Sequence, residues 1–156
     1  MKMKPIGTYQ TRQVFWFDYD QFQLDRLPKK DWLCLATSEI DPNDQKIEKF
    51  VRHSIDNGIL EFKGHGKFGE KLHDIFDEIM TQMEVVENHE PISVMTTWHN
   101  DETLADTFWE CFFATCLPES ADLDNISIIC TDLKGNDRSN ELKKILERFE
   151  KGWIPD

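Results

Sequence analysis

The chain has 156 residues, of which 39% are hydrophobic and 31% are charged. This length suits one domain over residues 1–156, and the apolar and aromatic content argues against a disordered chain. No run of 18 apolar residues is present, and the N-terminus lacks the apolar core of a secretory signal. We therefore expect a soluble cytoplasmic protein that does not enter a membrane.

The formal net charge is −12, from 30 acidic and 18 basic side chains, and the excess lies in one part of the sequence. Residues 72–133, here called the acidic block, contain 14 Asp or Glu and no Lys or Arg. Such a block repels nucleic-acid phosphates and attracts a basic protein surface. A solvated surface that keeps the protein soluble is the simpler interpretation of the same block.

The cysteines are not spaced as metal ligands or redox pairs. Cys34, Cys111, Cys116 and Cys130 form no Cys-x-x-Cys motif, which argues against a zinc ribbon or a thioredoxin-type site. All four fall in apolar strand or helix patterns, so we expect buried free thiols. The sequence indicates no metal and no cofactor.

From residue 31 onward, strand and helix patterns alternate. Short apolar runs predict strands at 31–37, 59–62, 91–97 and 125–131. Apolar residues at helical spacing predict helices at about 42–57, 70–83, 101–117 and 139–151. Asp41 and Pro42 are expected to open the first helix, and Asn100 or Asp101 to cap the third.

This alternation predicts a three-layer α/β fold with a four-stranded, mostly parallel sheet, similar to flavodoxin-like or Rossmann-like folds. Counting strands along the chain, we expect the order 2-1-3-4. That order places the second and third helices side by side on one face of the sheet. Residues 1–30 are expected to form an N-terminal arm or an extra edge strand around residues 14–19, in front of a core at 31–151.

If the second and third helices share a face, the acidic block becomes one surface patch. The outward positions of these helices, with one aromatic residue at a strand end, are the candidate partner-binding residues: Asp74, Asp77, Glu78, Glu102, Asp106, Glu110 and Trp98.

A second candidate site lies where the parallel strands end, because ligands of open parallel sheets bind beyond the carboxyl ends of the strands. His65, His99, Asp101 and Asp132 follow the second, third and fourth strands. Two imidazoles near carboxylates suit general acid–base chemistry, and His65, His99 and Asp101 also offer three metal ligands. Because any fold of this class puts polar loops at this edge, the pattern by itself does not define a catalytic or metal site.

Gly64-His65-Gly66-Lys67-Phe68-Gly69 matches the spacing of a dinucleotide-binding loop. It follows the second strand instead of the first, and it lies next to the acidic block. A structural glycine turn is therefore the favoured interpretation.

Two segments, residues 69–77 and 95–102, resemble a small bacterial family of uncharacterised α/β proteins. The shared features are an H-D-x-x-D pattern at a helix start (His73, Asp74, Asp77) and a T-T-W-H pattern at a strand end (Thr96 to His99). The resemblance covers roughly residues 32–117 and implies an α/β fold and a bacterial origin, without a known activity. It also implies that His73, Asp74, Trp98 and His99 meet near the carboxyl edge.

Three functions remain open. The first is a non-catalytic module whose acidic face docks a basic protein, as an immunity or antitoxin protein does with a cationic toxin. The second is a small enzyme or ligand sensor with a His/Asp site at the carboxyl edge. The third is a subunit of a larger assembly, in which residues 1–30 pair with another chain.

Overall fold

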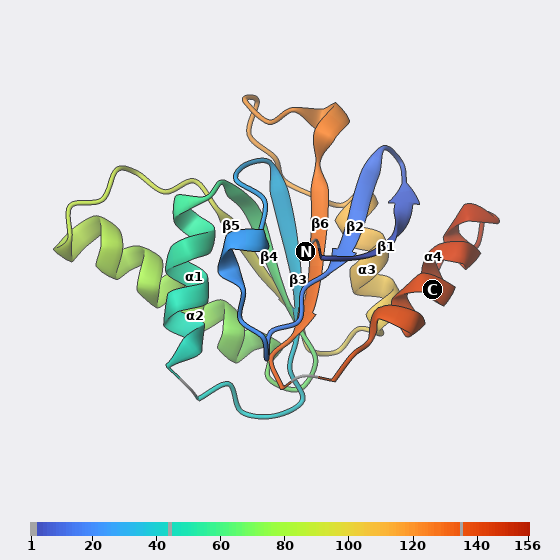
Figure 1. Cartoon of the computed structure of the whole chain (residues 1–156), viewed down its shortest axis with the longest axis horizontal. Coiled ribbons are helices and arrows are strands. Elements are labelled where there is room, and N and C mark those ends of the chain that lie inside the picture. The colour runs from blue at the N-terminus through green and yellow to red at the C-terminus, as the bar shows by residue number, and fades with distance from the viewer. Residues whose placement is uncertain (1–2, 44, 135) are drawn as a thin grey trace.

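The fold is organised around a six-stranded mixed sheet (Figure 1). The computed structural model describes residues 3–43, 45–134 and 136–156. The strands are β1 (Lys4–Tyr9), β2 (Arg12–Trp16), β3 (Trp32–Thr37), β4 (Ile59–His65), β5 (Met95–His99) and β6 (Ser127–Asp132). Their order is β1-β2-β6-β3-β4-β5, with β1 antiparallel to β2 and all other neighbours parallel. The predicted α/β class and the mostly parallel sheet are confirmed.

Helices cover both faces of this sheet (Figure 1). They are α1 (Lys46–Asp56), α2 (Gly69–Thr81), α3 (Leu104–Phe113) and α4 (Ser139–Glu150), with a π-helical turn at Gln82–Val86 and 3-10 turns at Leu24–Arg26 and Leu123–Asn125. Helices α1 and α2 pack on one face, and α3 and α4 on the other. Among the described residues, no helix has the length and apolar character needed to cross a membrane.

The predicted strand order 2-1-3-4 is wrong. The corresponding strands run β6-β3-β4-β5, so the third strand lies beside the second and the fourth beside the first. The chain moves in one direction through β3, β4 and β5, and right-handed crossovers therefore put α1 and α2 on the same face. It then returns across the sheet to β6, which puts α3 on the opposite face. The two acidic helices thus do not share a face, and the single acidic patch expected from the sequence is not formed.

Each face of β3 contributes to a separate hydrophobic core. Trp32 and Cys34 pack with α1 and α2, whereas Leu33 and Leu35 pack with α3 and α4. The whole of β3 is buried, as its continuous apolar run predicts for a central parallel strand.

The N-terminal segment is part of the sheet. β1 and β2 form a hairpin, and β2 pairs in parallel with β6 from Gln13 to Trp16. Of the two alternatives expected for residues 1–30, an arm or an extra edge strand around residues 14–19, the structure has a strand, β2 at Arg12–Trp16. It is not the edge, however, because β1, which was not predicted, lies outside it. The hairpin turn at Gln10 and Thr11 has positive φ angles without glycine, which removes the usual sequence signal of a tight hairpin.

The starts of α1 and α3 differ by a few residues from the predicted helix starts. α1 begins at Lys46, and the expected N-cap Asp41 instead forms an ion pair with Lys71. α3 is capped by Thr103, whose hydroxyl accepts from the Asp106 amide while the Asp106 carboxylate accepts from the Thr103 amide. This reciprocal cap outcompetes Asn100 and Asp101.

Candidate functional site

A row of polar side chains crosses the carboxyl edge of the sheet on the side of α3 and α4. Thr37 of β3 pairs in register with Asp132 of β6 and with His65 of β4, and His65 pairs with His99 of β5. Residues in register on parallel strands point to the same face. The fold therefore brings three of the four predicted site residues into one row. The fourth, Asp101, is exposed in the turn after β5 and lies outside the row.

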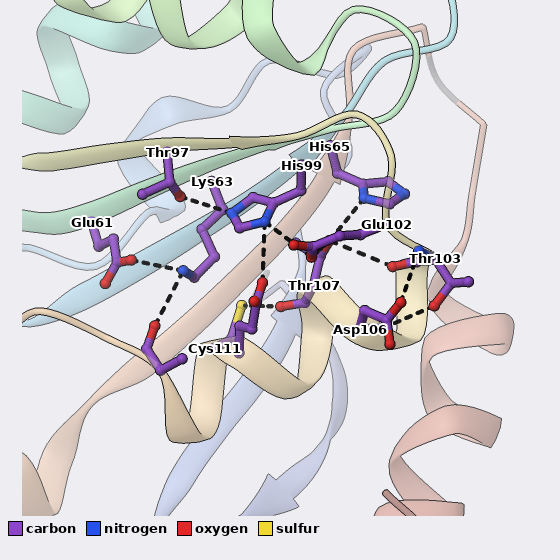
Figure 2. Close-up of polar contacts among 12 residues, drawn as sticks. Glu61, Lys63, His65, Thr97, His99, Glu102, Thr103, Asp106, Thr107 and Cys111 are labelled. Atoms are coloured by element: carbon purple, nitrogen blue, oxygen red, sulfur yellow. Dashed lines mark hydrogen bonds and ion pairs between the residues drawn. The ribbon is translucent and has the colours of Figure 1, made fainter. Parts of the chain in front are cut away.

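His99 is held between two carboxylates of α3 and the turn before it. Its Nδ1 lies 3.0 Å from Glu102 Oε1 and 3.1 Å from Glu110 Oε2. Its Nε2 lies 2.8 Å from the hydroxyl of Thr97, two residues earlier on β5. The His99 side chain is only 9% exposed, so the ring is fixed on both sides (Figure 2).

The two glutamates share this position unequally. Burial, together with the hydrogen bond and the negative charge of Glu102, raises the pKa of Glu110 to about 7. Burial also raises the pKa of Glu102, but hydrogen bonds from His99 and Glu110 outweigh it, so this pKa lies below its ordinary value. Near neutral pH, Glu102 is therefore ionised, while Glu110 is protonated in part of the molecules and ionised in the rest.

A hydrogen-bonded chain connects His65 to His99 (Figure 2). His65 Nδ1 lies 2.9 Å from the hydroxyl of Thr107. That hydroxyl donates to Glu102 Oε1 at 3.2 Å, so Nδ1 of His65 is the donor to Thr107. The two imidazoles are thus linked through one hydroxyl and one carboxylate, which is an arrangement that can pass or hold protons.

Asp132 belongs to a different part of the row. Its carboxylate accepts from the Thr37 hydroxyl at 2.6 Å and from Arg138 Nε at 3.2 Å, and it also accepts from the Lys134 amide. These bonds satisfy a buried carboxylate and join β6 to β3 and to the start of α4. Asp132 is therefore a structural residue beside the His65–His99 chain.

Glu102, Glu110, Thr97 and Thr107 complete the site, and sequence reasoning did not assign them to it. Glu102 and Glu110 were expected to face solvent as partner-binding residues. Glu110 lies on α3, whereas Glu102 lies in the turn just before the Thr103 cap, so helical spacing does not relate the two positions. Only the position of α3 and this turn under β4 and β5 shows that both glutamates meet His99.

The other face of β5 carries a second cluster. Trp98 stacks on His73 of α2 with ring centroids 4.6 Å apart, and the Thr96 hydroxyl donates to Asp77 Oδ1 at 2.7 Å. His73 Nε2 also lies 3.3 Å from Asp77 Oδ2. The H-D-x-x-D and T-T-W-H patterns therefore do meet, but His99 points to the opposite face from Trp98.

The glycine-rich segment has a structural explanation. A Cβ on Gly64 would lie 2.3 Å from the carbonyl oxygen of Gly69, so the end of β4 and the start of α2 touch through bare backbone. Asn100 Oδ1 accepts from the Glu70 amide at 2.8 Å at the start of α2. A side chain of the protein thus occupies the place at this helix start where a phosphate would bind in a dinucleotide loop.

The sequence model of a family described as a domain of unknown function, DUF7684, matches residues 14–149. The chain belongs to this family. The match begins within β2, ends one residue before the end of α4, and includes the whole of β3, β4, β5 and β6. No curated protein and no solved structure matches the chain.

Proposed function

We propose that this DUF7684 protein binds a basic protein partner at the β5 edge of its sheet, where an extended segment of the partner adds as a further strand. The observation that carries the proposal is that β5 is the edge strand and is flanked on both faces by the acidic block. The sequence predicted docking on a face shared by the second and third helices. The proposal places docking at the β5 edge instead, because α2 and α3 lie on opposite faces of the sheet.

β5 has few of the features that protect an edge strand. It is the last strand of the sheet, and its five residues include no Lys, Arg or Pro. Exposed edges without charged or proline residues pair readily with another chain. Strand addition would satisfy the outward backbone groups of β5, while alternate side chains contact the partner on both faces.

Acidic groups lie next to β5 on each face. On the α2 side, Asp77 contacts Thr96, and Asp74 lies 3.9 Å from His73, which stacks on Trp98. On the α3 side, Glu102 and Glu110 contact His99. Both flanks belong to the 62 residues that contain no Lys or Arg. Charge complementarity therefore favours a partner strand that carries Lys or Arg.

Trp98 supplies an apolar anchor at this edge. Its side chain is 50% exposed in the middle of the acidic surroundings, and exposed Met95 lies on the same strand. Buried tryptophans commonly dominate the binding energy of interfaces. Of the candidate partner-binding residues, Glu78 lies away from this edge, in the groove between α1 and α2, whereas Asp106 caps α3 and lines a hollow with Glu102 and Glu110.

The test uses isotope-labelled protein titrated with a synthetic peptide of alternating lysine and valine, with amide chemical shifts as the measurement. We expect the largest shifts at residues 95–99 and weaker binding at high salt. Trp98→Ala should weaken binding about 10-fold, and Asp74→Asn about 2-fold.

Matched controls lie at the far end of the sheet. Leu123→Ala removes an apolar side chain that is 60% exposed, slightly more than Trp98, and Asp124→Asn removes an acid of the same block near β2. Both should bind the lysine peptide like the unmodified protein, and a glutamate–valine peptide should not bind. Shifts spread away from β5, or equal losses in Trp98→Ala and Leu123→Ala, would contradict docking at this edge.

A small enzyme or ligand sensor at the carboxyl edge is the second candidate. The observation that favours it is the hydrogen-bonded chain from His65 through Thr107 and Glu102 to His99. This candidate uses the α3 side of β5, so it does not exclude docking at the edge.

A further inference from the structure

We infer that His99, Glu102 and Glu110 form a binding site for one divalent transition-metal ion of the zinc class. Glu102 and Glu110 also form the acidic flank of β5 in the docking proposal, but metal binding at these residues does not require that a partner docks there. Within residues 3–43, 45–134 and 136–156, no second group of three His, Cys, Asp or Glu side chains has ligand atoms as close together.

The three ligand atoms already converge. The imidazole Nδ1 and one oxygen from each glutamate all lie within 4.8 Å of one another, and Nδ1 is 3.0 and 3.1 Å from the two oxygens. A tetrahedral zinc ion with bonds of about 2.0–2.2 Å separates its ligands by about 3.3 Å. The two nitrogen–oxygen distances are thus already close to those in a zinc site, and the two glutamate oxygens lie within 4.8 Å of each other.

Charge gives a reason for a cation here. Two carboxylates approach one nitrogen in a site where the imidazole is about nine-tenths buried. Glu110 Oε2 is buried and lies 3.1 Å from His99 Nδ1, but no well-aligned hydrogen bond reaches it from the described residues. A buried carboxylate oxygen without a well-aligned donor is costly, and a cation held by all three groups removes that cost.

The surrounding hydroxyls match the supporting groups of metal sites. Thr97 contacts the second nitrogen of His99 at 2.8 Å, which leaves Nδ1 as the ligand atom. Thr107 donates to the Glu102 carboxylate. Partners of this kind orient the ligands of protein metal sites, and their loss typically weakens metal binding.

A solvent-filled hollow lies next to the site. It has a volume of about 260 Å³ and is lined by Glu102 and Glu110, together with Asp106, Trp109 and the C-terminal residues Ile154 and Pro155, but not by His99. Three protein ligands with an open side are typical of catalytic zinc sites, whereas structural zinc sites are closed by four. The hollow would hold the water or small molecule that completes the coordination of the ion.

Isothermal titration of chelator-treated protein with zinc chloride tests the site. We expect one zinc ion per chain with micromolar or tighter affinity, and a rise in melting temperature with zinc. Glu110→Gln keeps the shape of the side chain but should weaken zinc binding at least 10-fold. Thr97→Val keeps all three ligands and should weaken it about 10-fold.

His89→Gln is the matched control, because His89 also contacts a carboxylate, Asp56, at 2.9 Å, but no second carboxylate pairs with it in the part of the chain that the structure describes. This variant should bind zinc like the unmodified protein. Absence of one-to-one binding, or equal affinity in Glu110→Gln with native circular dichroism, would overturn the metal site. The lysine-peptide titration is run with chelator present, so its outcome is independent of this one.

Discussion

At the scale of single residues, the alternation of side chains along β5 separates two clusters. Thr96 and Trp98 face α2, where they meet Asp77 and His73, whereas Thr97 and His99 face α3. The sequence motif Thr96 to His99 is therefore two motifs, one for each face. Its residue types are visible in the sequence, but their partners come from helices on opposite sides of the sheet.

The cysteines illustrate the limit of reading burial from local pattern. Cys34, Cys111 and Cys130 are buried free thiols as predicted, and burial raises the pKa of Cys111 to about 12. Cys116 is exposed, which the prediction had wrong. α3 ends at Phe113, three residues before Cys116, so the apolar helical pattern continues past the point where the helix stops.

The first residue-scale prediction concerns His65. Burial lowers the pKa of His65, and nearby His99 and Arg138 lower it further, while Glu39 and Glu102 oppose the shift. The folded protein thus favours neutral His65, so this stabilising effect is present above about pH 6.5, the pKa expected for the unfolded chain, and is lost as the pH falls through the lower folded-state value.

Histidine side-chain NMR spectra recorded against pH measure this directly, with His89 as internal reference. The Glu90 carbonyl and Asp56 raise the pKa of His89, so His89 should become protonated first as the pH is lowered and His65 later. The reverse order would show that His65 is not held neutral. In His65→Gln, the loss of stability between pH 6.5 and 5 should be smaller than in the unmodified protein.

At the scale of elements, the contact between β4 and α2 depends on bare backbone. Gly64 and Gly69 approach so closely that a Cβ at either position would overlap the backbone of the other. Gly64→Ala should therefore force β4 and α2 apart and lower the free energy of unfolding by about 3 kcal/mol, measured by denaturant titration.

Gly7→Ala is the comparison for this change. A Cβ on Gly7 would meet the end of the flexible Leu146 side chain, which can move, so we expect a loss of about 1 kcal/mol. Equal losses in the two variants would show that the contact between β4 and α2 tolerates a wider spacing.

At the scale of the whole molecule, strand order decides where the acidic block lies. In the expected order 2-1-3-4, β4 would be an edge strand and β5 would be internal. In the structure, β5 is the edge and β4 lies between β3 and β5. The acidic helices α2 and α3 are consequently on opposite faces but both border β5, which turns an expected acidic face into an acidic edge.

Hydrogen exchange followed by NMR distinguishes the two orders. Amides of β3 and β4 should exchange slowly, through global unfolding, whereas those of β5 should exchange faster through local opening. Slow exchange across residues 95–99 together with fast exchange across 59–65 would support the order expected from the sequence instead.

Local periodicity and composition were enough to predict the alternating elements from β3 onward, the fully buried central strand and the acidic block at residues 72–133. The sequence also pointed to His65 and His99, which end neighbouring parallel strands. Tertiary structure alone decided that β5 is the edge, that α2 and α3 lie on opposite faces, and that Glu102 and Glu110 face His99. Crossover connections of the same length and handedness satisfy either strand order, so the choice depends on how side chains distant in sequence pack, and no local pattern records that packing.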